Sequence, residues 1–188
     1  MKVAVIGAGN GGQAMAAWIA NSGNSVSLYD RNEKKIEELR NLSTIELSGA
    51  VKVVSKIDVI THDIIECISH ADLIMLCTTA DAHQEIAQTI APYLKDEQVI
   101  VLNPGRTGGA LCFRNTLNRS DCHAKVYVGE AQTLVFACRL IKNGKVNIIG
   151  IKDRVLMSAI PASDNNIILE KLGQCFTCTG MKTKRARV

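Results

Sequence analysis

Short apolar runs alternate along this chain with amphipathic stretches of helical periodicity. The pattern predicts strands at residues 2–6, 25–29, 73–78, 99–102, 125–128, 146–151 and 155–160. It predicts helices at residues 11–21, 32–41, 64–69, 82–94, 109–118 and 165–175. Residues 44–60 are expected to form a small hairpin around Gly49 that leads into a third strand. Strands that alternate with helices in this way pair in parallel through crossover connections. The predicted fold is therefore α/β, a Rossmann-type doubly wound, mainly parallel sheet with helices on both faces.

Composition supports one domain over residues 1–176, followed by a basic C-terminal tail at 177–188. Aromatic residues make up only 4% of the chain, which favours a core of aliphatic strands covered by helices. The net charge of +4 comes from Lys182, Lys184, Arg185 and Arg187. Without these four, 18 basic residues balance 18 acidic ones, so we expect no nucleic-acid or membrane partner.

The chain is expected to be cytoplasmic. The apolar run at residues 2–6 is too short for a secretory signal, and no run approaches the roughly 20 apolar residues that cross a bilayer. The seven cysteines are odd in number and scattered, which is typical of reduced thiols. Cys175 and Cys178 have CxxC spacing without a second pair or a nearby histidine, so no metal site is predicted.

The sharpest motif is a glycine-rich turn, GAGNGG at residues 7–12, between the first strand and the first helix. Gly7 permits a tight turn, Gly9 lets a pyrophosphate approach the backbone, and Gly12 lets the helix pack closely on the sheet. The N-terminus of the helix then offers N–H donors and a partial positive charge to phosphate oxygens. This context predicts a dinucleotide site, whereas a glycine-rich structural turn is the alternative.

An acidic residue, Asp30, ends the second strand 18 residues beyond Gly12. A carboxylate at this place accepts hydrogen bonds from the adenosine ribose and repels the 2′-phosphate of NADP. It therefore favours NAD. The neighbouring Arg31 leaves NADP open, because its guanidinium can pair with a phosphate or stack on adenine.

Three further segments follow in order: NPGRTGGAL at residues 103–111, GEAQT at 129–133 and FACR at 136–139. Together with the glycine-rich turn, they resemble the opine dehydrogenase family, which includes octopine and nopaline dehydrogenases. The resemblance covers residues 1 to about 176. It implies an NAD(P)-dependent oxidoreductase that condenses an α-keto acid reductively with an amino acid.

The family resemblance also implies two domains, with a catalytic His–Asp pair in a second, helical domain. This chain has no segment that matches the catalytic histidine motif, so we expect that domain to be absent and the chain alone to be inactive. Keto acid and amino acid would then be partners only if a second domain is supplied. A homodimer is a further expectation, because a missing domain would leave apolar surface exposed.

The resemblance and the strand ends together select ten cofactor-binding positions and no catalytic or metal-binding ones. The glycine-rich turn is expected to wrap the pyrophosphate, and the positions after later strands to meet the nicotinamide half. The set is Gly7, Gly9, Asn10, Gly11, Gly12, Asp30, Arg31, Thr78, Thr79 and Asn103. For Thr78, Thr79 and Asn103, ordinary turn chemistry is the alternative.

The remaining polar residues are expected to have structural or surface roles rather than catalytic ones. His83 is expected to begin a helix near the cofactor, and Glu130 and Arg139 to form an internal ion pair. Arg106 is interpreted as a solvated loop residue. We expect the histidines that lack partners at diagnostic spacing to lie at the surface: His62, His70 and His123.

Three functions remain open from the sequence. The first is the cofactor-binding half of an opine-type dehydrogenase. The second is a stand-alone NAD(P)-binding module that senses redox state or regulates another protein. The third is an inactive gene product, since the apolar pattern ends near Cys175.

Overall fold

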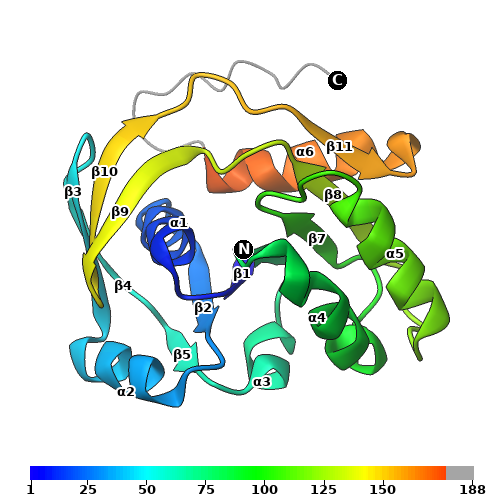
Figure 1. The fold of residues 1–188 in the computed structure, drawn as a ribbon, viewed down its shortest axis with the longest axis horizontal. Coiled ribbons are helices and arrows are strands. Elements are labelled where there is room, and N and C mark those ends of the chain that lie inside the picture. Colours follow the sequence, from blue (N-terminus) through cyan, green and yellow to red (C-terminus); the bar gives the residue numbers. More distant parts are fainter. Residues whose placement is uncertain (177–188) are drawn as a thin grey trace.

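The computed structural model describes residues 1–176 and contains two β-sheets (Figure 1). The larger sheet has seven strands in the order β11-β8-β7-β6-β1-β2-β5, parallel except for β11. Its strands are β1 (Lys2–Ile6), β2 (Ser25–Tyr29), β5 (Val59–Thr61), β6 (Leu73–Leu76), β7 (Val99–Leu102), β8 (Tyr127–Ala131) and β11 (Met157–Ile160). This sheet confirms the predicted Rossmann-type fold.

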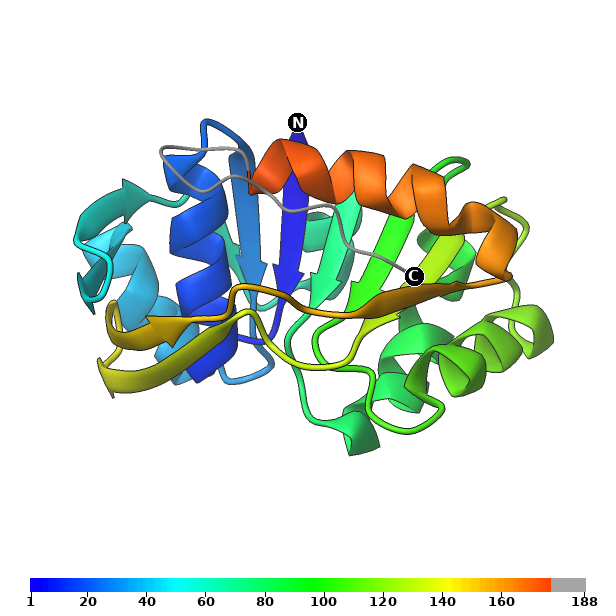
Figure 2. The same ribbon diagram turned by 90° about the horizontal axis from the view of Figure 1, so that it is seen from above.

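Helices cover both faces of the larger sheet, as predicted. They are α1 (Asn10–Asn21), α2 (Glu33–Leu42), α3 (Ile64–Ile68), α4 (His83–Ile90), α5 (Gly109–Arg119) and α6 (Asn165–Cys175). Side chains of alternate strand positions pack on α1 and α6 on one face and on α3, α4 and α5 on the other. Figure 2 shows α6 lying across the strands of the first face. None of the helices within residues 1–176 is long and apolar enough to cross a bilayer.

A second sheet was not predicted. It has four strands in the order β4-β3-β10-β9, which are β3 (Thr44–Gly49), β4 (Val53–Lys56), β9 (Phe136–Lys142) and β10 (Lys145–Ile151). The expected hairpin around Gly49 forms its β3–β4 half, and β3 pairs in parallel with β10. The strand β9 was missed because it has few buried positions: Phe136 is the one buried residue among its seven.

The helix α1 lies between the two sheets (Figure 1). It contacts β1 and β2 on one side and β3, β4, β9 and β10 on the other. Every residue from Gly12 to Ile19 is therefore buried. Small side chains such as Ala14, Ala16 and Ala17 allow both sheets to approach the helix closely. This packing holds the start of α1, which is also the glycine-rich turn, in a fixed place.

The described boundaries differ from the predicted ones at two positions near the candidate site. The strand β6 ends at Leu76 rather than at Thr78, so Thr78 lies in the following turn. The strand β8 runs to Ala131 rather than ending at Val128, so Glu130 lies within the sheet. The basic tail at 177–188, with Cys178, lies outside the described residues.

Replacement of Gly12 by alanine should destabilise the domain. An added Cβ atom would lie 1.6 Å from the carbonyl oxygen of Gly7, so the backbone itself must move. We expect the free energy of unfolding to fall by about 3 kcal/mol, measured by urea unfolding.

Gly173→Ala is the matched control for this change. Gly173 lies within α6, and no atom lies within 4 Å of an added Cβ. Alanine there should raise stability by about 0.5–1 kcal/mol because it favours the helix. Equal unfolding midpoints for the two variants would contradict the proposed contact between Gly12 and Gly7.

Candidate functional site

The predicted cofactor-binding positions meet at the carboxyl edge of the larger sheet. Adjacent strands β2, β1, β6 and β7 are parallel, so the segments that follow them emerge side by side (Figure 2). Asp30 follows β2, the glycine-rich turn follows β1, Thr78 and Thr79 follow β6, and Asn103 follows β7. In open parallel sheets this edge is where ligands bind.

In the glycine-rich turn, the space where a side chain would lie is empty at Gly9 but filled by protein atoms at the other glycines. Gly7 has φ +101°, and an added Cβ would lie 2.9 Å from Cγ2 of Thr78. Gly9 has an extended backbone, and no atom lies within 4 Å of an added Cβ. Gly9 is also the N-cap of α1, and no side chain caps the helix there. The turn thus presents bare backbone and an uncapped helix N-terminus to open space.

A segment distant in sequence packs on the other side of the same turn. An added Cβ at Gly11 would lie 2.8 Å from Cδ2 of Leu134, just before β9. The Oδ1 atom of Asn10 accepts a hydrogen bond of 3.1 Å from the backbone N–H of Leu140. The side chain of Asn10 therefore anchors β9 to the start of α1. Sequence reasoning missed this contact and the role of Leu134.

Asp30 lies beside the glycine-rich turn and is heavily hydrogen-bonded. Its Oδ2 atom accepts from the backbone N–H of Ala8 at 2.9 Å and from Nζ of Lys35 at 2.8 Å. Its Oδ1 atom accepts from the backbone N–H of Asn32 at 3.0 Å. Burial acts to raise the pKa of this carboxyl, but the bonds from Lys35, Asn32 and Ala8 outweigh it and lower the pKa. Asp30 is thus held as a carboxylate.

Lys35 is a residue of this site that sequence reasoning missed. It lies on α2, close to the N-cap Asn32, whose side chain accepts from the backbone N–H of Lys35. The available signal was its position five residues after Asp30, in the helix that follows β2. Arg31, which was predicted to bind the cofactor, has an exposed side chain.

The side chains that follow β6 and β7 differ in their hydrogen bonding. The hydroxyl oxygen of Thr78 is buried with no hydrogen-bond partner among the described residues. A hydrogen bond from the side chain of Thr79 lowers the pKa of Asp81. The nearby Arg31 and His83 lower this pKa further, by smaller amounts. The amide of Asn103 is buried and donates to the carbonyl of Val101 at 2.9 Å. Asn103 therefore lies at the predicted edge with its side chain turned back toward β7.

His83 begins α4, as predicted, and is buried, with 2% of its surface exposed. Neither ring nitrogen has a hydrogen-bond partner among the described residues. Burial lowers the pKa of His83, while Asp81 and Glu130 act in the opposite direction. His62, His70 and His123 are exposed, which confirms their surface placement.

Glu130 contacts the NPGRTGG loop, and the predicted ion pair with Arg139 is wrong. Its Oε2 atom accepts from the backbone N–H of Ala110 at 2.7 Å, at the start of α5. An added Cβ at Gly105 would lie 2.3 Å from this carboxylate. No ion pair within residues 1–176 joins Glu130 to Arg139, because Glu130 reaches α5 whereas Arg139 is exposed on β9. Arg106 is exposed in the loop, as expected.

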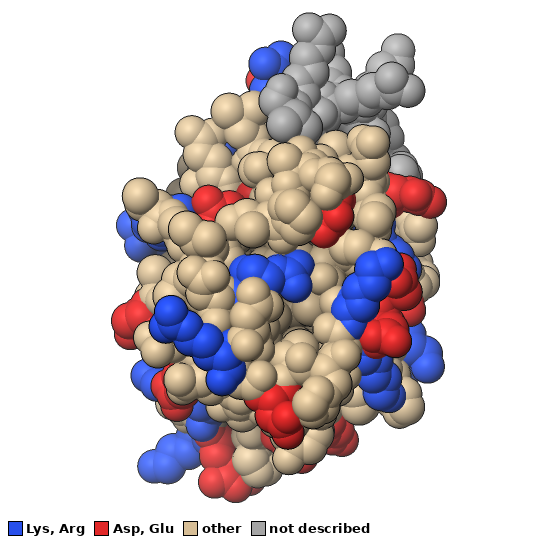
Figure 3. Space-filling view, turned by 90° about the vertical axis from the view of Figure 1, so that its right-hand side faces the viewer, with Lys and Arg blue, Asp and Glu red and all other residues tan. Residues whose placement is uncertain are grey.

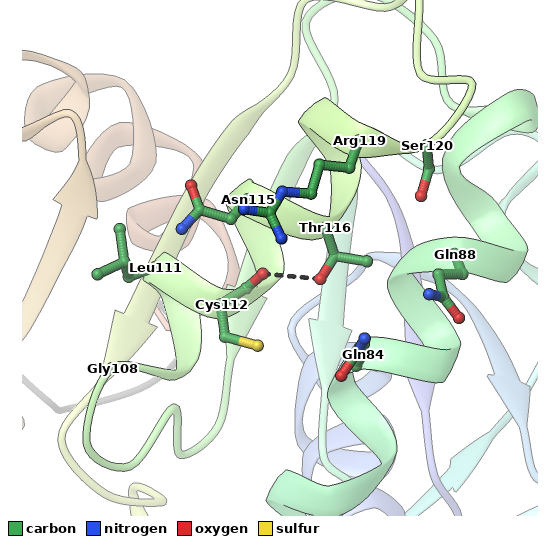
Figure 4. A pocket seen from close by; sticks show the side chains of 9 residues that line it. All are labelled: Gln84, Gln88, Gly108, Leu111, Cys112, Asn115, Thr116, Arg119 and Ser120. Atoms are coloured by element: carbon green, nitrogen blue, oxygen red, sulfur yellow. Dashed lines mark hydrogen bonds between the residues drawn. The ribbon is translucent and has the colours of Figure 1, made fainter.

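A pocket of about 450 Å³ lies between α4 and α5, outside the predicted set (Figure 4). Its walls combine apolar and polar surface and comprise Gln84, Gln88, Gly108, Leu111, Cys112, Asn115, Thr116, Arg119 and Ser120. On the face shown in Figure 3, Lys and Arg side chains are interspersed with Asp and Glu side chains. No patch of one sign covers that face.

Residues 1–176 contain no group of three or more His, Cys, Asp or Glu side chains that could hold a metal. The six cysteines in this range are free thiols. Burial raises the pKa of Cys67, Cys77 and Cys175 to about 12, so these thiols are protonated and unreactive at neutral pH. The second cysteine of the CxxC spacing, Cys178, lies outside the described range.

Comparison with known proteins gives consistent results. Residues 2–105 match the family described as NAD-dependent glycerol-3-phosphate dehydrogenase N-terminus. The opine dehydrogenase of Arthrobacter sp. (strain 1C) is 37% identical over 171 residues, which cover 90% of this chain and 47% of that protein. The octopine dehydrogenase of Pecten maximus is 31% identical over 178 residues, covering 89% of this chain and 44% of that enzyme.

A solved octopine dehydrogenase in complex with NADH and agmatine superposes with a TM-score of 0.80 and 28% identity. The match covers 97% of this chain and 47% of that structure. The chain therefore spans about half the length of the relatives it matches.

Burial of His83 generates a testable pH dependence. Its folded pKa is lowered from the ordinary value of 6.5, so the unfolded chain binds the proton more tightly. Stability should therefore be complete above pH 6.5 and fall as the pH drops below it. In His83→Leu the loss of stability between pH 8 and pH 5.5 should be smaller, as measured by urea unfolding at both pH values.

The matched control is His62→Leu, at an exposed position. It should leave the pH dependence of unfolding unchanged. A wild-type slope in His83→Leu would show that His83 is protonated as easily in the folded state as in the unfolded one.

Proposed function

The chain belongs to the family of NAD-dependent glycerol-3-phosphate dehydrogenase N-termini, and we propose that its glycine-rich turn holds the diphosphate of a nicotinamide dinucleotide. The observation that supports this most directly is the open position at Gly9. Gly7, Gly11 and Gly12 are each enclosed by protein atoms, whereas the space beside Gly9 is empty of them. Since the extended backbone of Gly9 would accept a side chain, folding alone does not require glycine there.

The residues that would hold the cofactor are those predicted from the sequence. Backbone N–H groups at the start of α1 would bind the phosphate oxygens, and Asp30 and Arg31 the adenosine end. Thr78, whose buried hydroxyl has no partner among the described residues, and Thr79 would lie toward the nicotinamide end. Asn103 would shape that end through its fixed position after β7. The bound cofactor would be NAD, with NADP accepted as well.

We assign the domain to an opine-type oxidoreductase on the basis of the degree of sequence identity along nearly the whole chain. The opine and octopine dehydrogenases match about nine-tenths of this chain, through β8, β9 and β10. The glycerol-3-phosphate dehydrogenase of Teredinibacter turnerae matches 94% of it but is only 26% identical, against 37% for the opine dehydrogenase of Arthrobacter sp. (strain 1C). The higher identity over a comparable share of the chain, together with the GEAQT and FACR segments, therefore favours the opine family.

The proposed reaction joins an α-keto acid to the amino group of an amino acid, and the nicotinamide supplies the hydride. Structures of octopine dehydrogenase with NADH contain L-arginine in one case and pyruvate in another. We propose that residues 1–176 form one cofactor-binding domain of such an enzyme. The groups that transfer protons to the substrate would lie outside this domain, because His83, its buried histidine, has no hydrogen-bonded carboxylate.

Gly9→Ala should separate cofactor binding from folding. The added methyl group meets no protein atom, so the melting temperature should stay within about 1 °C of the wild type. The same methyl group would occupy the space through which the diphosphate approaches, so the Kd for NADH should rise about tenfold or more. The measurements are NADH fluorescence titration and thermal unfolding.

Gly150→Ala, on β10, is the matched control, because its added Cβ also meets no atom within 4 Å. It should leave the Kd for NADH unchanged. Wild-type affinity in Gly9→Ala would remove the glycine-rich turn from the binding site.

A second expected outcome concerns catalysis. Supplied with NADH, pyruvate and L-arginine, this chain alone should bind NADH without oxidising it, as followed by absorbance at the nicotinamide band. Sustained oxidation that depends on both organic substrates would show that the chain contains its own catalytic groups.

A further inference from the structure

The adenosine end of the proposed site contains a partly buried ion pair. Nζ of Lys35 lies 2.8 Å from Oδ2 of Asp30, and the two side chains are 26% and 12% exposed. Lys35 is held in place from its backbone as well, because its N–H bonds the side chain of Asn32. The ammonium, on the first turn of α2, is thus held against Asp30 at the end of β2.

This ion pair reduces the capacity of Asp30 to accept bonds from a ribose. A carboxylate offers about four acceptor positions. Donors of Ala8 and Lys35 occupy two of them on Oδ2, and the N–H of Asn32 occupies one on Oδ1. About one acceptor position remains, so the two ribose hydroxyls cannot both be received by this carboxylate.

The same pair changes the electrostatics of the adenosine end. An unpaired carboxylate would repel a 2′-phosphate, but the charge of Asp30 is balanced by Lys35 at contact distance. One of the three N–H donors of Lys35 is used by Asp30, which leaves two for phosphate oxygens. Arg31, exposed and adjacent in sequence to Asp30, adds a second cation.

We infer that Lys35 is a specificity-determining residue that allows the adenosine end to accept NADPH as well as NADH. This inference rests on the proposed function, since it concerns the same site. It contrasts with the expectation from Asp30 alone, which favours NAD. The ion pair makes the acidic residue at the end of β2 compatible with a phosphate.

The test compares the affinities of both cofactors by fluorescence titration at low salt. The wild type should bind NADPH with a Kd within about tenfold of that for NADH. In Lys35→Met, which keeps a long helix-forming side chain, the carboxylate is left uncompensated. The Kd for NADPH should then rise about tenfold or more, whereas that for NADH should change by about threefold at most.

Two further variants act as controls. Lys34→Met removes an exposed charge from the neighbouring position and should leave the ratio of the two Kd values unchanged. Lys35→Arg keeps the charge and should keep NADPH binding within about threefold of the wild type. Thermal unfolding of all three variants verifies that the fold is retained.

The possible failures are distinguishable. If the wild type binds neither cofactor, the proposed function itself is wrong. If it binds NADH but not NADPH, or if Lys35→Met weakens both cofactors equally, the role assigned to Lys35 is overturned while the dinucleotide site stands.

Discussion

The contact between Gly12 and the carbonyl of Gly7 sets the geometry on which the rest of the structure depends. Only a residue without a side chain can lie this close to a backbone oxygen. The contact brings the start of α1 against the end of β1, so the helix rises directly from the sheet. The uncapped N-terminus of α1 then faces the carboxyl edge, where the segments after β2, β6 and β7 also emerge.

The second sheet turns this helix from a surface element into a buried one. Because β3, β4, β9 and β10 cover the outer side of α1, its middle turns are enclosed on both sides. Two contacts connect this sheet to the glycine-rich turn. Leu134, just before β9, packs on Gly11, and the backbone N–H of Leu140 donates a hydrogen bond to the side chain of Asn10. The turn is consequently braced by residues more than a hundred positions away, which limits its freedom to adopt other conformations.

Polar groups around the carboxyl edge fall into two classes. Asp30, Glu130 and Asn103 each form hydrogen bonds within the protein that define the shape of the edge. Thr78 and His83 are buried without partners among the described residues, which is costly in a folded protein. The second class consists of buried polar atoms whose hydrogen-bonding capacity the described part of the chain leaves unused.

The sequence by itself determined the alternation of strands and helices in the larger sheet, its parallel pairing, the glycine-rich turn and the placement of Asp30. These features follow from local periodicity and from the backbone freedom of glycine, both of which can be recognised from neighbouring residues. Only the tertiary structure decided that 136–142 is a strand, that Lys35 pairs with Asp30, and that Glu130 bonds Ala110 instead of Arg139. Those outcomes depend on contacts between distant segments and on the direction of side chains, for which spacing along the chain carries no signal.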